Sequence, residues 1–211
     1  MKNILLVGAG EKFGLELTKI YLQNNWSVWS MGSVIPDGCK PLNINWNTFT
    51  PDDVESIANK LPSLDAVFFN QNSIGPPMST HFTGDEFGHD ELFSWSKSHW
   101  INNQMPVYLL RKLGDKINNK TTVGWQLGWG NFNLPKDDHG WSLAGYASAK
   151  MTNLIVMRGF ANTKLAIFYA IDPGGISPDD RSAVASKIFK LQTSLTPSDN
   201  GRVMDIEKRD V

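Results

Sequence analysis

Hydrophobic residues along this chain fall into short runs, separated by longer segments in which apolar residues return every three or four positions. A short run that is apolar throughout is typical of a strand buried on both faces, as in a parallel sheet covered by helices. The runs that we interpret as strands cover residues 2–7, 26–31, 41–46, 66–69, 121–127, 164–171 and 202–206. The pattern is weakest in the third and the last of these runs.

The segments between the runs predict helices over residues 13–21, 50–61, 86–113, 145–161 and 182–191. Thr50 offers an N-cap to the second of these helices, and Pro51 is a favoured first helical residue. Pro106 lies inside the third, where its missing N–H and its ring predict a kink or a break.

Strands and helices that alternate in this way predict an α/β fold of the Rossmann type, a doubly wound, mostly parallel sheet with helices on both faces. Residues 1–211 contain no internal repeat, low-complexity tract or linker, so we expect a single domain. In such a fold the ligands lie outside the carboxyl ends of the strands.

The composition restricts the partners and the compartment. The 20 Lys and Arg and the 21 Asp and Glu leave a formal net charge of −1, which gives no electrostatic reason to expect nucleic acid or an anionic membrane. The apolar run that starts at Ile4 is too short for a signal-peptide core, and no later run has the roughly 18 apolar residues of a membrane-spanning helix. Cys39 is the only cysteine, so a disulfide within the chain is impossible and a reducing compartment is expected. We therefore expect a soluble, cytoplasmic protein.

The first candidate site is the turn between the first strand and the first helix. Gly8, Gly10 and Gly14 lie there, together with Lys12 and Phe13. Glycines let a backbone approach a pyrophosphate closely, and a helix N-terminus offers unpaired N–H groups and partial positive charge. These five residues are predicted to bind a dinucleotide. A tight strand–helix connection that binds no ligand is the alternative interpretation.

The end of the second strand bears on the choice of dinucleotide. Rossmann domains that prefer NAD usually carry Asp or Glu there, which binds the ribose 2′-hydroxyl. Here the strand ends without a carboxylate, and Ser30, Ser33 and Lys12 would accommodate a 2′-phosphate better than an acid would. NADP is therefore the expected cofactor, with NAD as the alternative.

Tyr146 and Lys150 form the clearest chemical signal in the chain. They are four residues apart in a predicted helix and therefore share one face. A free tyrosine titrates near ~10, and a neighbouring cation lowers that pKa by stabilising the phenolate. The tyrosine could then give a proton to a carbonyl oxygen as hydride reaches the carbon, or remove it in the reverse direction. An exposed Tyr–Lys pair without a role is the alternative, but the small residues around the pair favour close approach of a cofactor.

Five segments, in their order along the chain, resemble motifs of the short-chain dehydrogenase/reductase family. The length of the chain resembles that of the family's short, C-factor-like members. The Tyr-x-x-x-Lys pair is the most specific match. The other matches are the glycine turn, the polar segment after the fourth strand, the helix asparagine and the Pro-Gly turn after the sixth strand, at residues 8–14, 70–73, 102 and 172–174.

The resemblance implies an oxidoreductase that transfers hydride between NADP(H) and a small carbonyl or alcohol substrate. Tyr146 would be its acid/base, Lys150 would hold the ribose and lower the tyrosine pKa, and Asn102 would belong to a proton relay. The cofactor would also be lined by residues of the matching turns: Asn70, Pro173 and Gly174. A homo-oligomer, either a dimer or a tetramer, is implied as well.

The glycine turn and the segment after the fourth strand depart from the family's pattern. Lys12 replaces the middle glycine of the turn, which means that the turn is reshaped or that the lysine side chain points outward. The segment after the fourth strand keeps only its first asparagine, Asn70, and ends in Ser73 where the family has glycine.

The fifth strand lacks the family's serine, which hydrogen-bonds the substrate oxygen. No serine occurs between residues 98 and 142. Trp125 or Gln126 takes the position according to the register, whereas counting back from Tyr146 leads to Asn133. An amide can donate an N–H to a carbonyl, so Gln126 is the expected substitute, with Asn131 and Asn133 as the alternatives. Loss of one such donor typically lowers a rate by about 10²–10³.

Two other functions stay open. The missing serine and Lys12 would suit a nucleotide-binding regulator or sensor that keeps the fold and has abandoned catalysis. A Rossmann-like methyltransferase would share Gly8 and Gly10, but it normally needs an acidic residue at the end of the second strand.

Aromatic residues and histidines outside these motifs receive no firm role. The tryptophan-rich segment 125–141 could line a substrate site, or it could simply pack the loop or an oligomer contact. The spacing of the central histidines matches no standard zinc pattern, so no metal is expected; they are His81, His89 and His99.

Overall fold

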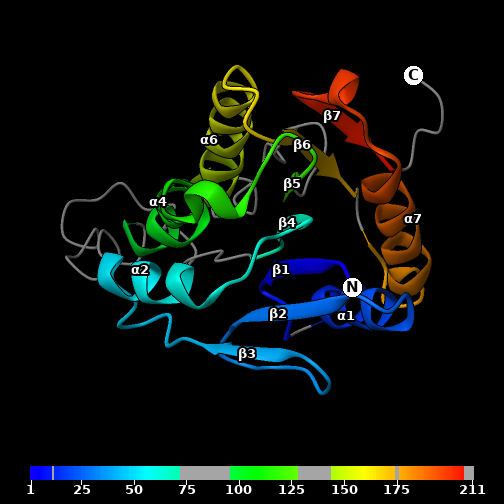
Figure 1. Ribbon diagram of the computed structural model, residues 1–211, viewed down its shortest axis with the longest axis horizontal. Coiled ribbons are helices and arrows are strands. Elements are labelled where there is room, and N and C mark those ends of the chain that lie inside the picture. Colours follow the sequence, from blue (N-terminus) through cyan, green and yellow to red (C-terminus); the bar gives the residue numbers. More distant parts are fainter. Residues whose placement is uncertain (11, 72–95, 128–143, 174–175, 207–211) are drawn as a thin grey trace, which may run out of the picture.

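One sheet of parallel strands organises the protein, in the order β3-β2-β1-β4-β5-β6-β7 (Figure 1). The computed structural model describes residues 1–10, 12–71, 96–127, 144–173 and 176–206, with only the backbone of residues 144–146. The strands are β1 (Asn3–Val7), β2 (Ser27–Gly32), β3 (Lys40–Asn43), β4 (Ala66–Phe69), β5 (Thr122–Gln126), β6 (Ile167–Asp172) and β7 (Arg202–Asp205). Every pairing among these strands is parallel, whereas the sequence predicted a mostly parallel sheet.

The sheet grows in both directions from the boundary between β1 and β4. Ile4 of β1 lies opposite Val28 of β2 on one side and opposite Ala66 of β4 on the other. The strand order reverses here, which makes this boundary the topological switch point where open α/β sheets place their ligands. The predicted doubly wound Rossmann-type fold is therefore confirmed.

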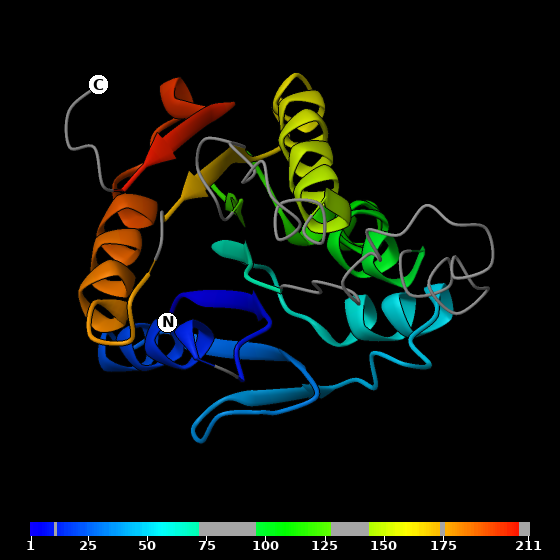
Figure 2. The same cartoon turned by 180° about the vertical axis from the view of Figure 1, so that it is seen from behind.

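Helices cover both faces of the sheet. On one face lie α1 (Phe13–Gln23) and α7 (Arg181–Ser194), and on the other α2 (Pro51–Lys60), α4 (Met105–Leu113) and α6 (Ala144–Ala161), as Figure 2 also shows from behind. Residues of β1 alternate between the two layers and are fully buried throughout 4–7, as the apolar run predicted. None of the helices in the described ranges combines the length and the apolar content needed to cross a membrane.

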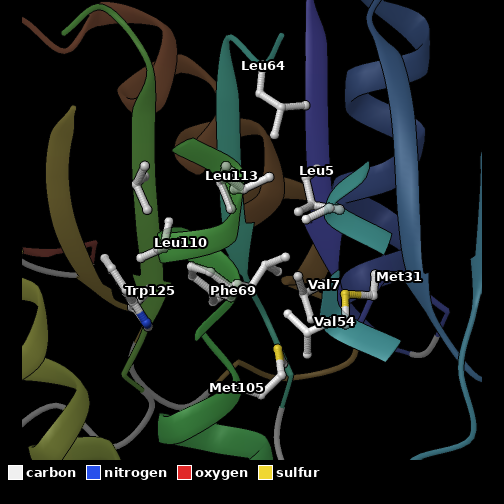
Figure 3. Packing of buried hydrophobic residues seen from close by; sticks show 14 of the residues in the cluster. Leu5, Val7, Met31, Val54, Leu64, Phe69, Met105, Leu110, Leu113 and Trp125 are labelled. Carbon is white, nitrogen blue, oxygen red and sulfur yellow. The ribbon is translucent and has the colours of Figure 1, made fainter. Parts of the chain in front are cut away.

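The larger core lies between the sheet and the layer of α2, α4 and α6 (Figure 3). Val7 and Phe69 from the two central strands pack there with Val54 of α2 and Met105 of α4. The indole of Trp125 on β5 stacks on the Phe69 ring, with 5.1 Å between the ring centroids. Full burial of a large apolar side chain contributes about 1.5–3 kcal/mol, so this layer fixes α4 firmly over the sheet.

Local signals explain where the helices begin. The hydroxyl of Thr50 accepts a hydrogen bond from the N–H of Asp53, and the Asp53 carboxylate accepts one from the N–H of Thr50, so the predicted cap of α2 is a complete capping box. The predicted break near Pro106 is a change of helix type. A π-helical turn, η1 (Trp100–Gln104), passes directly into α4, and Pro106 lies in the first turn of α4.

Two strand boundaries differ from the predictions by three residues, and the others by at most one. The sixth strand begins at Ile167 rather than 164, because Lys164 adopts a φ of 56° that no strand accommodates. The third strand ends at Asn43 rather than 46, because Asn45 starts a turn in which its side chain accepts the N–H of Asn47 at 3.0 Å. The short 3₁₀ helices η2 (Gly114–Lys116) and η3 (Pro197–Asp199) were not predicted.

A pair of glycine substitutions tests this packing. A Cβ at Gly124 in β5 would lie 2.4 Å from the buried Tyr169 ring and 2.7 Å from Phe68, so we expect Gly124→Ala to lower the free energy of unfolding by about 1–3 kcal/mol. A Cβ at Gly159 in α6 would meet no atom within 4 Å, and Gly159→Ala should raise it by about 0.5–1 kcal/mol. Urea denaturation measures both; equal stability of the two variants would contradict the described packing of β5.

Candidate functional site

The carboxyl ends of the parallel strands bring most of the predicted site residues to one edge of the sheet. Gly8 follows β1, Asn70 follows β4, Gln126 ends β5 and Pro173 follows β6. These strand ends are neighbours, because Val7 pairs with Phe69, the last residue of β4. Residues distant in the sequence thus meet where the fold is expected to bind a ligand.

Lys150 reaches this edge from α6. Its Nζ donates hydrogen bonds to the backbone carbonyl of Gln126 at 3.0 Å and to that of Gln71 at 3.3 Å, so the ammonium lies at the ends of β5 and β4. The side chain is 1% exposed, and burial lowers the pKa of Lys150 to about 7. Tyr146 lies one helical turn earlier in α6, as the sequence predicted, although its side chain is outside the described part of the structure.

The π-helical turn carries two buried asparagines. Asn102, the predicted relay residue, donates from Nδ2 to the hydroxyl of Ser98 at 3.1 Å. Its neighbour Asn103 joins this turn to α6, donating from Nδ2 to the carbonyl of Ala149 at 2.6 Å and to the side chain of Asn153 at 2.9 Å. The sequence predicted a role only for Asn102. That a second asparagine follows it directly was the one signal that could have pointed to Asn103.

The end of β5 carries the two candidates for the position of the missing serine. Trp125 is fully buried and belongs to the core under α4, and its indole Nε1 is buried without a hydrogen-bond partner among the described residues. Gln126 lies at the strand end beside Lys150, and its side-chain Oε1 is buried without a hydrogen-bond partner among the described residues. Asn131 and Asn133 lie outside the described residues.

Contacts within the protein account for each glycine of the turn. Gly8 has a φ of 77°, and a Cβ there would lie 2.8 Å from the backbone N of Gln71. A Cβ on Gly10 would lie 2.1 Å from the carbonyl oxygen of Val34, and one on Gly14 would lie 2.2 Å from that of Gly8. The turn therefore needs its glycines to pack against neighbouring segments before any ligand is considered.

Lys12 has a positive φ, a backbone conformation that residues other than glycine rarely adopt. It is the N-cap of α1 with φ 46° and ψ −111°, and its side chain is exposed. The lysine side chain points outward, as one of the two predicted alternatives has it. Among the described residues, no side chain makes a capping hydrogen bond to the first turn of α1. Phe13, the next residue, is buried in the core between α1 and α7.

The predicted hydroxyls of β2 separate into one inside the fold and one outside it. Ser30 is fully buried in the strand, and its Oγ has no hydrogen-bond partner in the described part of the chain. Ser33, just past the strand, is exposed. Ser33 and Lys12 are therefore the two predicted phosphate-binding residues that solvent can reach in this structure.

Asn70 fastens the glycine turn to β4. Its Nδ2 donates to the carbonyl of Gly8 at 2.9 Å and its backbone N–H to that of Val7 at 3.0 Å, while its Oδ1 is buried without a described partner. Pro173 is buried directly after β6, and Gly174 lies outside the described residues. Among the described side chains, no group of three or more His, Cys, Asp or Glu is arranged to hold a metal ion.

The similarity of this chain to known proteins lies in its structure. No family model matches the chain, and no curated protein matches it. A short chain dehydrogenase family protein from Francisella tularensis subsp. tularensis SCHU S4 superposes with a TM-score of 0.76 at 16% identity, covering 98% of this chain and 97% of that one. The chain has the short-chain dehydrogenase fold.

Two other structures with the short-chain dehydrogenase fold contain nucleotides. An oxidoreductase of this type from Brucella ovis, in complex with a partially ordered NAD, is 19% identical, with a TM-score of 0.73 and coverage of 97% of this chain and 99% of that one. A short chain dehydrogenase from Shigella flexneri 2a str. 301, complexed with NADP, is 15% identical, with a TM-score of 0.77 and coverage of 98% and 97%. The C-factor-like subtype stays a prediction.

The buried lysine predicts a pH dependence of stability. Because the pKa of Lys150 falls from 10.5 to about 7 on folding, the unfolded chain binds more protons than the folded protein between these values. Stability therefore rises with pH in that window, by up to about 1.4 kcal/mol per pH unit. Between about pH 7.5 and pH 9.5, the free energy of unfolding should rise more in the wild type than in Lys150→Met. Parallel pH profiles would show that Lys150 is not buried as described.

The conformation of Lys12 predicts the effect of restoring the glycine. Strained backbone at a non-glycine residue costs about 1–3 kcal/mol, which a glycine would relieve. Glycine also makes the unfolded chain more flexible, and this lowers the free energy of unfolding by about 0.5–1 kcal/mol. Lys12→Gly should therefore raise the free energy of unfolding by about 1 kcal/mol. Lys19→Gly, at an exposed position in the middle of α1, should lower it by about the same amount. Thermal or urea denaturation that orders the two variants the other way would contradict the assignment.

Proposed function

We propose that the protein is an NAD(P)-dependent oxidoreductase of the short-chain dehydrogenase/reductase type, which transfers hydride between the nicotinamide and a small carbonyl or alcohol substrate. The observation that carries the proposal is the Lys150 ammonium, held at the ends of β4 and β5 one helical turn after Tyr146. Similar structures in complex with NAD and with NADP support it.

The residues at the strand ends fit a dinucleotide. The uncapped N-terminus of α1, with Lys12 beside it, suits an anionic pyrophosphate. The buried, unpaired amide oxygens of Asn70 and Gln126 are acceptors that ribose hydroxyls or a carboxamide could satisfy, and Lys150 can donate to the same groups. When bound, the nicotinamide supplies the hydride or accepts it.

The chain's own residues would handle the proton and the substrate oxygen. Tyr146 donates its phenolic proton to the carbonyl oxygen, and Lys150 favours the resulting phenolate as long as its own amine is charged. Gln126 Nε2 donates to the same oxygen in place of the family's serine. Because burial lowers the pKa of Lys150 to about 7, this assistance weakens as the pH rises above neutrality in the unliganded protein.

NADP is the preferred cofactor in this proposal. No carboxylate ends β2, and both Ser33 and Lys12 are exposed near that end of the site. Ser30 would need to leave its buried position to contribute. A cytoplasmic location and a dimer or tetramer accompany the proposal as further predictions.

A second candidate function is a nucleotide-binding regulator or sensor with little or no catalysis. The burial of Trp125 favours it, because one of the two positions for the serine carries a core side chain. In that case Lys150 and the glycine turn would bind the nucleotide and no substrate would be turned over.

Fluorescence titration with NADPH and NADH tests the proposal, followed by a panel of carbonyl substrates. We expect binding of both nucleotides, tighter for NADPH, and oxidation of NADPH that falls by at least about 100-fold in Tyr146→Phe. The nucleotide Kd of that variant serves as the control and should stay close to that of the wild type. Binding without turnover over the whole panel would favour the regulator, and absence of binding would exclude both functions.

A further inference from the structure

Gln71 joins four segments of the site, although no sequence motif assigned it a role. It lies two residues beyond β4 and is 6% exposed. Its backbone presses so closely on the glycine turn that a Cβ on Gly8 would lie 2.8 Å from its N and 2.9 Å from its Cα. Its side chain contacts the π-helical turn, and its carbonyl contacts Lys150 of α6.

The side chain of Gln71 satisfies a carbonyl that the helix leaves unpaired. In the π-helical turn the N–H of Met105 bonds to the carbonyl of Trp100, five residues back. The corresponding donor for Ile101 would be residue 106, which is a proline and has no N–H. Gln71 Nε2 donates to the Ile101 carbonyl instead, at 3.3 Å in a buried environment. The Ile101 carbonyl thus receives its hydrogen bond from the segment that follows β4.

The carbonyl of Gln71 is one of the acceptors of Lys150 among the described residues, at 3.3 Å. We propose that Gln71 is a positioning residue: its side chain, anchored to the π-helical turn, fixes the carbonyl that holds the Lys150 ammonium at the end of β4. Gln71 thereby fixes the position of Lys150 relative to the π-helical turn that carries Asn102.

The two hydrogen bonds of Gln71 depend on each other. A free glutamine after a strand end can rotate its backbone, whereas one tied at Nε2 and wedged against Gly8 presents its carbonyl in one direction. A buried ammonium depends strongly on each of its acceptors, because water does not replace a lost one. The proposal deepens the proposed function, since Lys150 is its central residue, but its test needs no catalytic activity.

Gln71→Met keeps the length of the side chain and removes its donor. We expect Lys150 in this variant to react with acetic anhydride at pH 7 about threefold faster or more than in the wild type, measured by mass spectrometry. A weaker acceptor set leaves more of the amine uncharged, and a looser segment exposes it; both changes raise the rate. The matched control is Gln192→Met, because Gln192 is a buried glutamine on α7 that donates to the hydroxyl of Thr122 at 3.1 Å and is not among the acceptors of Lys150.

Because Gln192 also accepts a hydrogen bond from the buried Tyr21 hydroxyl, the control should lose at least as much stability, yet leave the labelling of Lys150 at the wild-type rate. Equal labelling of Lys150 in Gln71→Met and the wild type, or an equal rise in the Gln192→Met control, would overturn the proposal. If Gln71→Met does not fold, Gln71→Asn, whose shorter amide falls short of Ile101, is expected to change the labelling in the same direction. Failure of the wild type to bind NADPH would refute the proposed function and leave this result standing.

Discussion

A buried ammonium group needs oxygen acceptors close around it, and in this protein two parallel strands provide them. Lys150 leaves α6 and ends between the backbone carbonyls of Gln126 and Gln71. Gln126 ends β5 and Gln71 lies two residues beyond the neighbouring β4, so the parallel pairing of these strands brings the two carbonyls to the same edge of the sheet. The register that pairs Phe69 with Trp125 sets the distance between the two strand ends. A shift of that register would remove the acceptors, and the burial of the charge would then cost several kcal/mol.

Most of the fold could be predicted from the sequence, because its signals are local. The apolar run of β4 coincides with the predicted residues 66–69, and the capping box at Thr50 starts α2 where its residues indicated. Parallel order and two-sided helix layers then follow from general rules of connection. The boundaries that failed, near Lys164 and Asn45, are turns whose backbone conformation is set by single residues rather than by periodicity.

The site could be predicted only in part, because several of its residues act through tertiary contacts. Spacing alone placed Tyr146 and Lys150 one turn apart. The role of Gln71 required knowledge of which helix carbonyl lacks a donor, and that depends on a π-helical turn that no pattern announced. Likewise, the register of β5 decides that Trp125 enters the core, where it stacks on Phe69.

The glycine turn shows why a motif can point to a ligand and still be needed by the fold. Gly8, Gly10 and Gly14 each touch a neighbouring backbone so closely that a methyl group would collide. Lys150 is different, since burial of a lysine makes a folded protein less stable unless something else benefits. The inference of a ligand therefore rests more securely on the lysine than on the glycines.

The order of strands in the sheet has a consequence for how the chain folds while it is being synthesised. β1 is translated first, but its partner β4 exists only after residue 66 has been added. The apolar face of α1 is covered by α7, which follows α2, α4 and α6 along the chain. Pairings between such distant segments form slowly and leave apolar surface open to association with other chains in the meantime. The strand and the helix that open the sheet are thus made well before the segments that cover them.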